Sequence, residues 1–394
     1  MRVDKYLDLF NKKGYCIIKE IDTRFDNSEF INSQENLFSQ IDNKLNSISY
    51  EKVSFVNDDS KDNLYPYKIY FDTSKVEIKV IRNLKAYVEE ILNINHQIEK
   101  LNTEEKLNSY TYYRGHSSWR FLLQPSIYRE GNGSLLENED RMFRDIIASK
   151  PHLFNDCNST LEMLVKMQHH GIPTRLLDLT DNPLISLFFA CNENDEVDKG
   201  IHGEVTVFNV AQEKFKYYDS DTVSVLANLV KCNFHFDISD FNLTGDVEWR
   251  KLCAYDAVDK KQKWNDYFEK KTTEFNKIKI ISELVHFIRD DKPYFLPRVF
   301  PSHLDNFSLV VKPKMSIDRI VNQSGAFVLF GIKKAKSSCA DFNINTEGYK
   351  KKVLIIPSIY KKQIIKELKL FNINDSTVFC DFDNTAKFFK EKYK

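Results

Sequence analysis

The hydrophobic pattern of residues 160–191 predicts a helix, a buried strand and a second helix in close succession. One helix face carries three apolar side chains and one polar side chain at the spacing i, i+3, i+4 and i+7, namely Leu161, Leu164, Val165 and Gln168. Gly171 and Pro173 then end this helix. Residues 175–179 predict a short buried strand, and residues 184–191, apolar on nearly every side, predict a buried helix. The polar residues between these elements therefore lie at the ends of a core strand, where functional sites are commonly built.

Strands and helices alternate at unequal intervals along the rest of the chain. An aromatic run at 110–113 predicts a strand that stops at Arg114 and Gly115, and the alternating pattern of 203–210 predicts another strand. Further strands are expected over 309–312, 327–332 and 353–356, and helices over 81–101, 135–150 and 359–371. This mixture predicts an α+β fold in which helices surround a mixed β-sheet.

The length of 394 residues favours two domains or one large, elaborated domain. Residues 1–82 carry no chemical motif, and we expect them to form an accessory segment or domain, or else strands that extend the main sheet. Their pattern predicts short helices over 3–11 and 30–45 and strands over 14–18, 64–71 and 76–80. Residues 83–394 are expected to form the main domain, in which 211–305 is a variable insertion that caps or lengthens a pocket.

Composition and charge narrow the class of protein. Lys plus Arg and Asp plus Glu both number 57, so the formal net charge of zero predicts no whole-chain attraction to nucleic acid or to an anionic membrane. No apolar run approaches the ~20 residues that span a bilayer. The seven cysteines include no CxxC pair, which favours free thiols and gives no zinc-site spacing. We therefore expect a cytoplasmic protein with no membrane partner and no metal cofactor.

Two charged residues at strand ends are the first candidates for chemistry. The guanidinium of Arg114 suits bidentate binding of a phosphate or carboxylate, and Gly115 beside it leaves room for a ligand to approach. The alternative role of Arg114 is a structural salt bridge with Asp178 or Asp181. Asp178 lies in the predicted buried strand, where a carboxylate is costly unless it is paired or used. It therefore either orients Arg114, Arg175 or a histidine, or takes part in a reaction.

Two adjacent histidines end the first helix of the 160–191 stretch. His169 and His170 point about 100° apart on a helix, so both can face one site only because the helix stops at Gly171. One imidazole could act as a general base or bind a substrate. Alternatively, one caps the helix C-terminus and the other packs in the core. Arg175 is expected to pair with a carboxylate, and Thr180 either to contact a ligand or to cap the second helix.

These motifs, taken together, resemble the FRG domain, a family named for a Phe/Tyr-Arg-Gly tripeptide. The resemblance is carried, in order along the chain, by Tyr113-Arg114-Gly115-His116, Leu123-Gln124-Pro125-Ser126, Gln168-His169-His170-Gly171, Pro173-Thr174-Arg175-Leu176-Leu177-Asp178, Asp181–Ala190, Arg319-Ile320, Gln323-Ser324-Gly325-Ala326-Phe327, Ile356-Pro357, Leu368, Ile373 and Phe379. It covers roughly residues 84–394. Several separated motifs in the right order make the resemblance specific to this family.

The same motifs are similar to parts of the ADP-ribosyltransferase fold, and this resemblance implies a split mixed sheet that binds NAD. In that fold, a first strand ends in Arg or His followed by Gly, and a later strand and helix carry a Ser or Thr and an aromatic–Ala pair. Residues 113–115, 178–180 and 187–190 match those pieces. A late-strand glutamate of the fold corresponds here to Gln323, which can bind ribose hydroxyls but brings no negative charge. The carboxylate role would then fall to Asp178.

The resemblance therefore implies an NAD-dependent ADP-ribosyltransferase-like or NAD glycohydrolase-like enzyme, acting as a toxin or an effector of bacterial antiviral defence. The implied catalytic residues are Arg114, His170, Asp178 and Gln323. The residues implied to bind NAD, which is a substrate here, are Tyr113, Arg114, Gly115, His116, His169, Arg175 and Thr180. The implied partners are NAD or a related nucleotide and a protein or nucleic-acid acceptor.

Two other functions fit the same residues. A nucleotide or nucleic-acid sensor would use the pocket without turnover, which Gln323 favours. Lysine-rich runs at 333–336 and 350–352 would then contact phosphates, or else form solvated faces. An RNA-processing hydrolase would use His169 or His170 as its base. Release of nicotinamide would indicate the enzyme that consumes NAD, and binding without product would indicate the sensor. Activity that survives NAD depletion would indicate the RNA-processing hydrolase.

Overall fold

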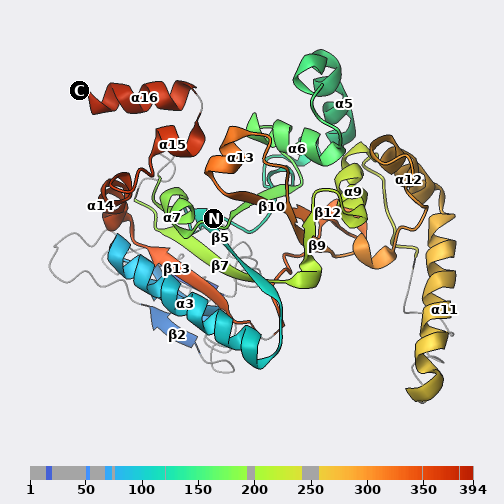
Figure 1. Ribbon diagram of the computed structural model, residues 1–394, viewed down its shortest axis with the longest axis horizontal. Helices are drawn as coiled ribbons and strands as arrows, with labels where there is room; N and C mark the ends of the chain where they lie inside the picture. Colours follow the sequence, from blue (N-terminus) through green and yellow to red (C-terminus); the bar gives the residue numbers. More distant parts are fainter. Residues whose placement is uncertain are drawn as a thin grey trace, which may run out of the picture.

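The structure is a computed structural model that describes residues 15–19, 50–53, 67–72, 76–119, 121–192, 200–241, 257–347, 349–380 and 382–393. Its centre is a mixed sheet of eight strands (Figure 1). The strand order is β4 (Val76–Val80), β13 (Lys351–Ile356), β7 (Gly203–Ala211), β5 (Ser109–His116), β6 (Leu176–Thr180), β10 (Gly325–Phe330), β9 (Ser308–Lys312) and β8 (Phe215–Tyr217). Neighbouring strands are antiparallel except for the parallel pairs β4–β13 and β8–β9.

Two smaller sheets accompany the main sheet. One is antiparallel and has the order β1 (Tyr15–Lys19), β3 (Tyr67–Asp72) and β2 (Tyr50–Val53). The other pairs β11 (Ile332–Lys333) with β12 (Ala335–Cys339).

The helices form two groups that pack on one face of the main sheet. Alternate side chains of each strand point to that face and supply its apolar surface. The first group comprises α4 (Gly133–Glu137), α5 (Glu139–Ser149), α6 (Thr160–His169), α9 (Asp221–Ala227), α11 (Ala257–Asn276), α12 (Lys279–Asp291) and α13 (Asp318–Asn322). The second group comprises α3 (Leu84–Glu104), α7 (Pro183–Cys191), α14 (Ser358–Lys369), α15 (Asp375–Phe379) and α16 (Phe382–Lys392). Helix α3 lies along β13 and β7, and α11 and α16 extend at opposite ends of the molecule (Figure 1). Short 3-10 helices are η1 (Ser126–Tyr128), η2 (Pro151–Leu153), η3 (Gln212–Lys214), η4 (Asn228–Lys231) and η5 (Pro301–His303).

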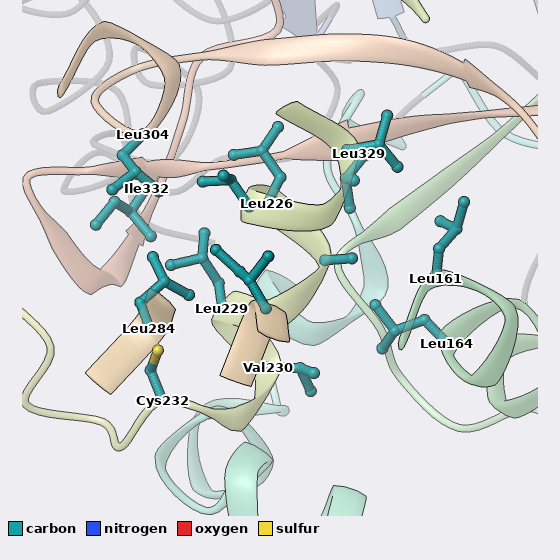
Figure 2. Packing of buried hydrophobic residues seen from close by; sticks show 14 of the residues in the cluster. Leu161, Leu164, Leu226, Leu229, Val230, Cys232, Leu284, Leu304, Leu329 and Ile332 are labelled. Atoms are coloured by element: carbon teal, nitrogen blue, oxygen red, sulfur yellow. The ribbon is translucent and has the colours of Figure 1, made fainter. Parts of the chain in front are cut away.

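The core follows this division of the helices. The first group packs on β6, β10 and β9, and the apolar cluster formed there includes Leu164, Leu226, Leu284 and Leu329 (Figure 2). The second group packs on β5, β7 and β13. The opposite face of the sheet has its own apolar cluster, to which residues 339–344 contribute. Burial of these clusters is the main favourable term that holds the layers together.

The two helical groups meet above a seam in the sheet. Strand β5 pairs with β7 from Ser109 to His116, whereas its register with β6 consists of the single pair Tyr113–Thr180. We call the unpaired stretch beyond that pair, residues 114–116 beside 177–179, the β5–β6 seam. Along this stretch β5 and β6 do not bond to each other, so the backbone groups that face the seam need other partners. A side chain can therefore enter between the two strands.

The local predictions for residues 160–191 are confirmed. Helix α6 ends at His169, and Gly171 has a φ of +80°, which a glycine adopts without strain. Strand β6 and helix α7 follow, and the cap of α7 is Asn182, whose side chain accepts the N–H of Leu184 at 2.9 Å, and not Thr180. The α+β class and the mixed sheet are confirmed as well.

The first 82 residues contribute at least one strand to the main sheet. Strand β4 runs parallel to β13 from Val76 to Val80, so the sheet begins before the expected domain boundary. Strands β1, β3 and β4 match three predicted strands within a few residues. The helices expected over 3–11 and 30–45 lie outside the described residues. The division into 1–82, 83–394 and the insertion 211–305 stays a prediction. Among the helices described, none is long and apolar enough to cross a membrane.

Candidate functional site

Arg114 enters the β5–β6 seam with its guanidinium. Its Nη1 donates to the main-chain carbonyl of Asp178, and its Nε donates to Nε2 of His116 at 2.7 Å. Its Nη1 also lies 3.8 Å from Oδ2 of Asp178. The Arg114 side chain thus donates the hydrogen bond that the Asp178 carbonyl would otherwise receive from a paired strand. The Arg114 side chain is 12% exposed, and in the described part of the chain its Nη2 group makes no hydrogen bond.

Asp178 faces solvent, which corrects the expectation of a buried carboxylate. Its side chain is 59% exposed although both neighbours, Leu177 and Leu179, are buried. The reason is that β6 alternates, so Asp178 points to the face where the two helical groups meet and neither group covers it. A carboxylate beside Arg114 therefore remains accessible to a ligand.

A chain of hydrogen bonds leads from Asp178 into the body of the domain. Oδ1 of Asp178 accepts a hydrogen bond from Nε2 of Gln168 at 2.7 Å. Oε1 of Gln168 accepts the hydroxyl of Thr174, and the main-chain N–H of Thr174 donates to Oγ of Ser126 at 3.0 Å. We call Gln168, Thr174 and Ser126 the amide relay. Sequence reasoning gave neither Gln168 nor Thr174 a functional role. Gln168 could have been singled out because it is the one polar residue on an otherwise apolar helix face.

The local electrostatics favour an anion. Burial lowers the pKa of Arg114 to about 10, Asp178 opposes that shift, and the nearby positive charge of Arg129 adds to it. Burial also lowers the pKa of Arg129, against the attraction of the same Asp178. Both guanidiniums stay protonated near neutral pH, so two positive charges share one carboxylate. Arg129 follows η1, where its Nε donates to the carbonyl of Gln124 at 3.3 Å, and sequence reasoning missed it.

The remaining residues of the Tyr-Arg-Gly-His motif are placed by packing. Tyr113 is buried under the second helical group, and its hydroxyl donates to Asn95 at 3.1 Å. His116 is buried and accepts from Arg114, so its Nε2 carries no proton in this arrangement. Gly115 was expected to admit a ligand, but a Cβ there would lie 1.8 Å from the carbonyl oxygen of Ser186. The glycine is required by the close approach of helix α7.

Gln323 does not join Arg114 and Asp178. The register places Tyr113, Thr180 and Gly325 in one row across β5, β6 and β10. Asp178 lies on one side of this row, and Gln323, two residues before Gly325, lies on the other. The side-chain NH₂ group of Gln323 donates to the main-chain carbonyl of Val378 at 3.2 Å, and the main-chain carbonyl of Gln323 accepts the Thr180 hydroxyl at 2.6 Å. Thr180 therefore holds the start of β10.

The two histidines lie at the end of α6, next to the amide relay. His170 is the exposed C-cap residue of the helix, and the ring centroids of His169 and His170 are 5.0 Å apart at an angle of 69°. A histidine at a helix C-terminus is favoured there by the helix dipole. Their expected roles in binding and catalysis stay predictions.

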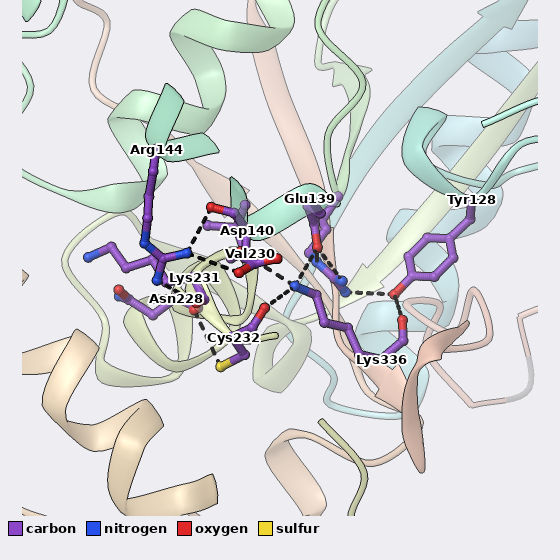
Figure 3. Close-up of polar contacts among 10 residues, drawn as sticks. Tyr128, Glu139, Asp140, Arg144, Asn228, Val230, Lys231, Cys232 and Lys336 are labelled. Carbon is purple, nitrogen blue, oxygen red and sulfur yellow. Dashed lines mark hydrogen bonds and ion pairs between the residues drawn. The ribbon is translucent and has the colours of Figure 1, made fainter. Parts of the chain in front are cut away.

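Arg175 pairs with a carboxylate as predicted, but in the interior and away from the seam. Glu139 accepts its Nε and Nη2 at 2.6–3.0 Å, and Tyr128 accepts its Nη1 at 2.6 Å (Figure 3). Nζ of Lys336 lies 3.0 Å from the same carboxylate and donates to the carbonyl of Cys232. We call Glu139, Arg175 and Lys336 the buried ion triad, since each is at most 1% exposed.

The buried ion triad changes two sequence-based expectations. Its contacts occupy the Arg175 guanidinium, which therefore does not reach the seam. Lys336 was expected either to contact phosphate or to be solvated, and Lys352, in the second lysine run, is likewise buried and pairs with Glu77. Burial lowers the pKa of Lys336, although Glu139 opposes this.

The segment 211–305 forms a hollow of its own. The hollow has a volume of about 630 Å³ and lies between α9 and the loop that leads to η5. Its lining includes Tyr294, Leu296 and Arg298, and neither Arg114 nor Asp178 lines it. Within the described residues, no group of three or more His, Cys, Asp or Glu side chains is placed to hold a metal ion.

The fold and the site together define an α+β protein in which a largely buried arginine meets a solvent-facing aspartate at a seam of a mixed sheet. Residues 109–199 match the family model of the FRG domain, so the chain carries an FRG domain. The match contains the Arg114–Asp178 pair, Arg129, the amide relay and two of the three members of the buried ion triad. Gln323 and Lys336 lie outside it. No curated protein and no solved structure matches the chain.

Proposed function

We propose that this FRG-domain protein binds NAD at the β5–β6 seam and cleaves its N-glycosidic bond, in the manner of an ADP-ribosyltransferase or an NAD glycohydrolase. The observation that carries the proposal is the pairing of a largely buried guanidinium that keeps Nη2 available with an exposed carboxylate 3.8 Å away. Arg114 and Arg129 supply two cations for the diphosphate, since a guanidinium suits phosphate oxygens.

The chemistry needs a negative charge near the ribose. The bond between the nicotinamide nitrogen and ribose C1′ breaks, its electron pair leaves with nicotinamide, and C1′ becomes oxocarbenium-like. Water or an acceptor hydroxyl then bonds to C1′ and loses its proton. Asp178 is suited to stabilise the positive charge at C1′ because the Gln168 amide and Arg114 hold its carboxylate in place.

The setting of this activity is part of the proposal. An enzyme that consumes NAD in the cytoplasm would act as a toxin or as an effector of bacterial antiviral defence. The acceptor would be water, a protein or a nucleic acid.

A second candidate is a nucleotide sensor that binds at the seam without turnover. The observation that favours it is the position of Gln323, which is uncharged and lies across the Tyr113–Thr180–Gly325 row from Asp178. The carboxylate of Asp178 is moreover already engaged by Gln168 and Arg114, which suits binding without turnover.

The test is to incubate the full chain with NAD, with and without protein or RNA acceptors, and to quantify nicotinamide by chromatography. We expect release that falls at least about a hundredfold in Asp178→Asn and in Arg114→Lys, which keeps the charge but loses the forked donors. Matched controls are Asp181→Asn and Arg141→Lys, at exposed positions outside the seam. NAD or ADP-ribose binding without nicotinamide release would establish the sensor, and absence of both would overturn the assignment of NAD.

A further inference from the structure

We propose that Gln168 is a positioning residue that holds the Asp178 carboxylate out of a bidentate ion pair with Arg114, so that one edge of the guanidinium stays open to an anionic ligand group. The inference rests on the proposed function only for the identity of that ligand as a nucleotide. The positioning itself is a property of the side chains at the seam.

The distances at the seam show an ion pair that is held incomplete. A charge-assisted hydrogen bond between a guanidinium and a carboxylate is about 2.7–2.9 Å long, and the preferred geometry uses both carboxylate oxygens. Here Oδ2 of Asp178 lies 3.8 Å from Nη1 of Arg114, while Oδ1 accepts the Gln168 amide at 2.7 Å. The bond to Gln168 turns Oδ1 toward the end of α6, and the ion pair with Arg114 is left at 3.8 Å through Oδ2, beyond hydrogen-bond distance.

The donors of Arg114 show what the incomplete pair leaves available. Nε is bound to His116, and Nη1 is bound to the main-chain carbonyl of Asp178. Nη2 is the group that a bidentate contact with Asp178 would consume, and within the described residues it makes no hydrogen bond. Although the side chain as a whole is only 12% exposed, Nη2 is not one of the fully buried unpartnered atoms, so it is open to solvent and to an incoming anionic ligand.

The Gln168 amide can act in this way because its own orientation is fixed. Oε1 accepts the hydroxyl of Thr174, which is 1% exposed, and Ser126 accepts the N–H of the same threonine. With the amide oxygen facing a donor, the NH₂ group must face the carboxylate. The amide relay thus couples the end of α6 and the turn at η1 to the rotamer of Asp178.

The first experiment compares binding in a double-mutant cycle. Affinities of the full chain for NAD and for inorganic pyrophosphate are measured by calorimetry for wild type, Gln168→Leu, Asp178→Asn and the double variant. We expect Gln168→Leu to bind both probes at least about tenfold more weakly, because the released carboxylate closes on Arg114. In the Asp178→Asn background the same substitution should have little effect, since no carboxylate is left to close.

The controls separate positioning from other roles. Gln363→Leu removes a comparable exposed amide–carboxylate bond, to Glu367 in α14, and should leave binding unchanged. Thr174→Val serves as a second variant in case Gln168→Leu folds poorly. It removes the hydroxyl that orients the Gln168 amide, and it should also weaken binding. A loss that persists undiminished in the Asp178→Asn background would mean that Gln168 contacts the ligand or is merely structural, and would overturn the proposal.

The second experiment needs no ligand and is therefore independent of the proposed function. A crystal structure of Gln168→Leu should show both Asp178 oxygens within about 3 Å of Arg114 nitrogens. An unchanged carboxylate, still near the wild-type separation of 3.8 Å, would overturn the positioning role. If wild type binds neither NAD nor pyrophosphate while the carboxylate closes as expected, the assignment of NAD fails and the positioning role stands.

Discussion

At the scale of single residues, neighbours on one strand serve different parts of the molecule. Arg114 turns toward β6 and Asp178, whereas Tyr113 and Gly115 face the second helical group. The sequence motif joins the three residues because they are adjacent, but a strand sends successive side chains to opposite faces. One motif therefore combines a candidate ligand contact with two packing positions.

Gly115→Ala tests the packing half of that motif. Because the new Cβ would lie 1.8 Å from the Ser186 carbonyl, helix α7 has to shift away from β5, and we expect a loss of stability of about 3 kcal/mol or more. Thermal or urea denaturation measures it. Gly133→Ala is the matched control, because its Cβ would meet nothing within 4 Å and its position opens helix α4. Equal stability of the two variants would contradict the close approach of α7.

At the scale of elements, the buried ion triad fastens pieces that are distant in the sequence. Glu139 begins α5, Arg175 precedes β6, and Lys336 belongs to β12, while Cys232 adds the end of η4. Two cations around one carboxylate are tolerable in the interior only because every one of them is bonded. The triad therefore sets where α5 lies relative to the strand that carries Asp178.

Glu139→Gln should be among the most destabilising single substitutions in the first helical group. It removes the only negative charge of the triad and leaves Arg175 and Lys336 buried together, at an expected cost of about 3–5 kcal/mol. Chemical denaturation gives the magnitude. Glu137→Gln, two residues earlier and exposed, should change stability by less than about 0.5 kcal/mol. A small effect at 139 would show that Lys336 loses its proton when the carboxylate is removed.

At the scale of the whole molecule, stability should depend on pH through a buried histidine that joins β7 to α14. Nδ1 of His202 accepts the N–H of Ser358 at 3.1 Å, and burial, with a contribution from Lys361, lowers the pKa of His202 to about 4. The unfolded chain binds a proton near pH 6.5 and the folded chain does not. The free energy of unfolding should therefore fall as the pH drops from about 6.5 to about 4.

His202→Gln isolates this effect, because glutamine keeps a side-chain acceptor but does not titrate. The difference in unfolding free energy between wild type and variant should be constant above about pH 7 and shrink by up to about 3 kcal/mol toward pH 4. Urea denaturation across that range measures the difference. A pH-independent difference would show that the pKa of His202 is the same in the folded and unfolded chains.

The sequence by itself determined the local elements around the site. The spacing of apolar residues located α6, β6 and α7, and Gly171 and Pro173 located the end of α6, because periodicity and turn chemistry act over a few residues. The motifs of the first half also sufficed to indicate the FRG domain, which the match over residues 109–199 confirms. The pairing of Arg175 with a carboxylate, expected from its place just before the buried strand, is confirmed as well.

Only the tertiary structure decided which of those residues meet. Arg114 and Asp178 are 64 positions apart and come together because β5 and β6 stop pairing after one register pair, which no local pattern encodes. The same register separates Gln323 from them and leaves Asp178 exposed at the boundary of two helical groups. Register and helix packing are set by contacts between distant segments, so the residues at the seam follow from the folded chain as a whole.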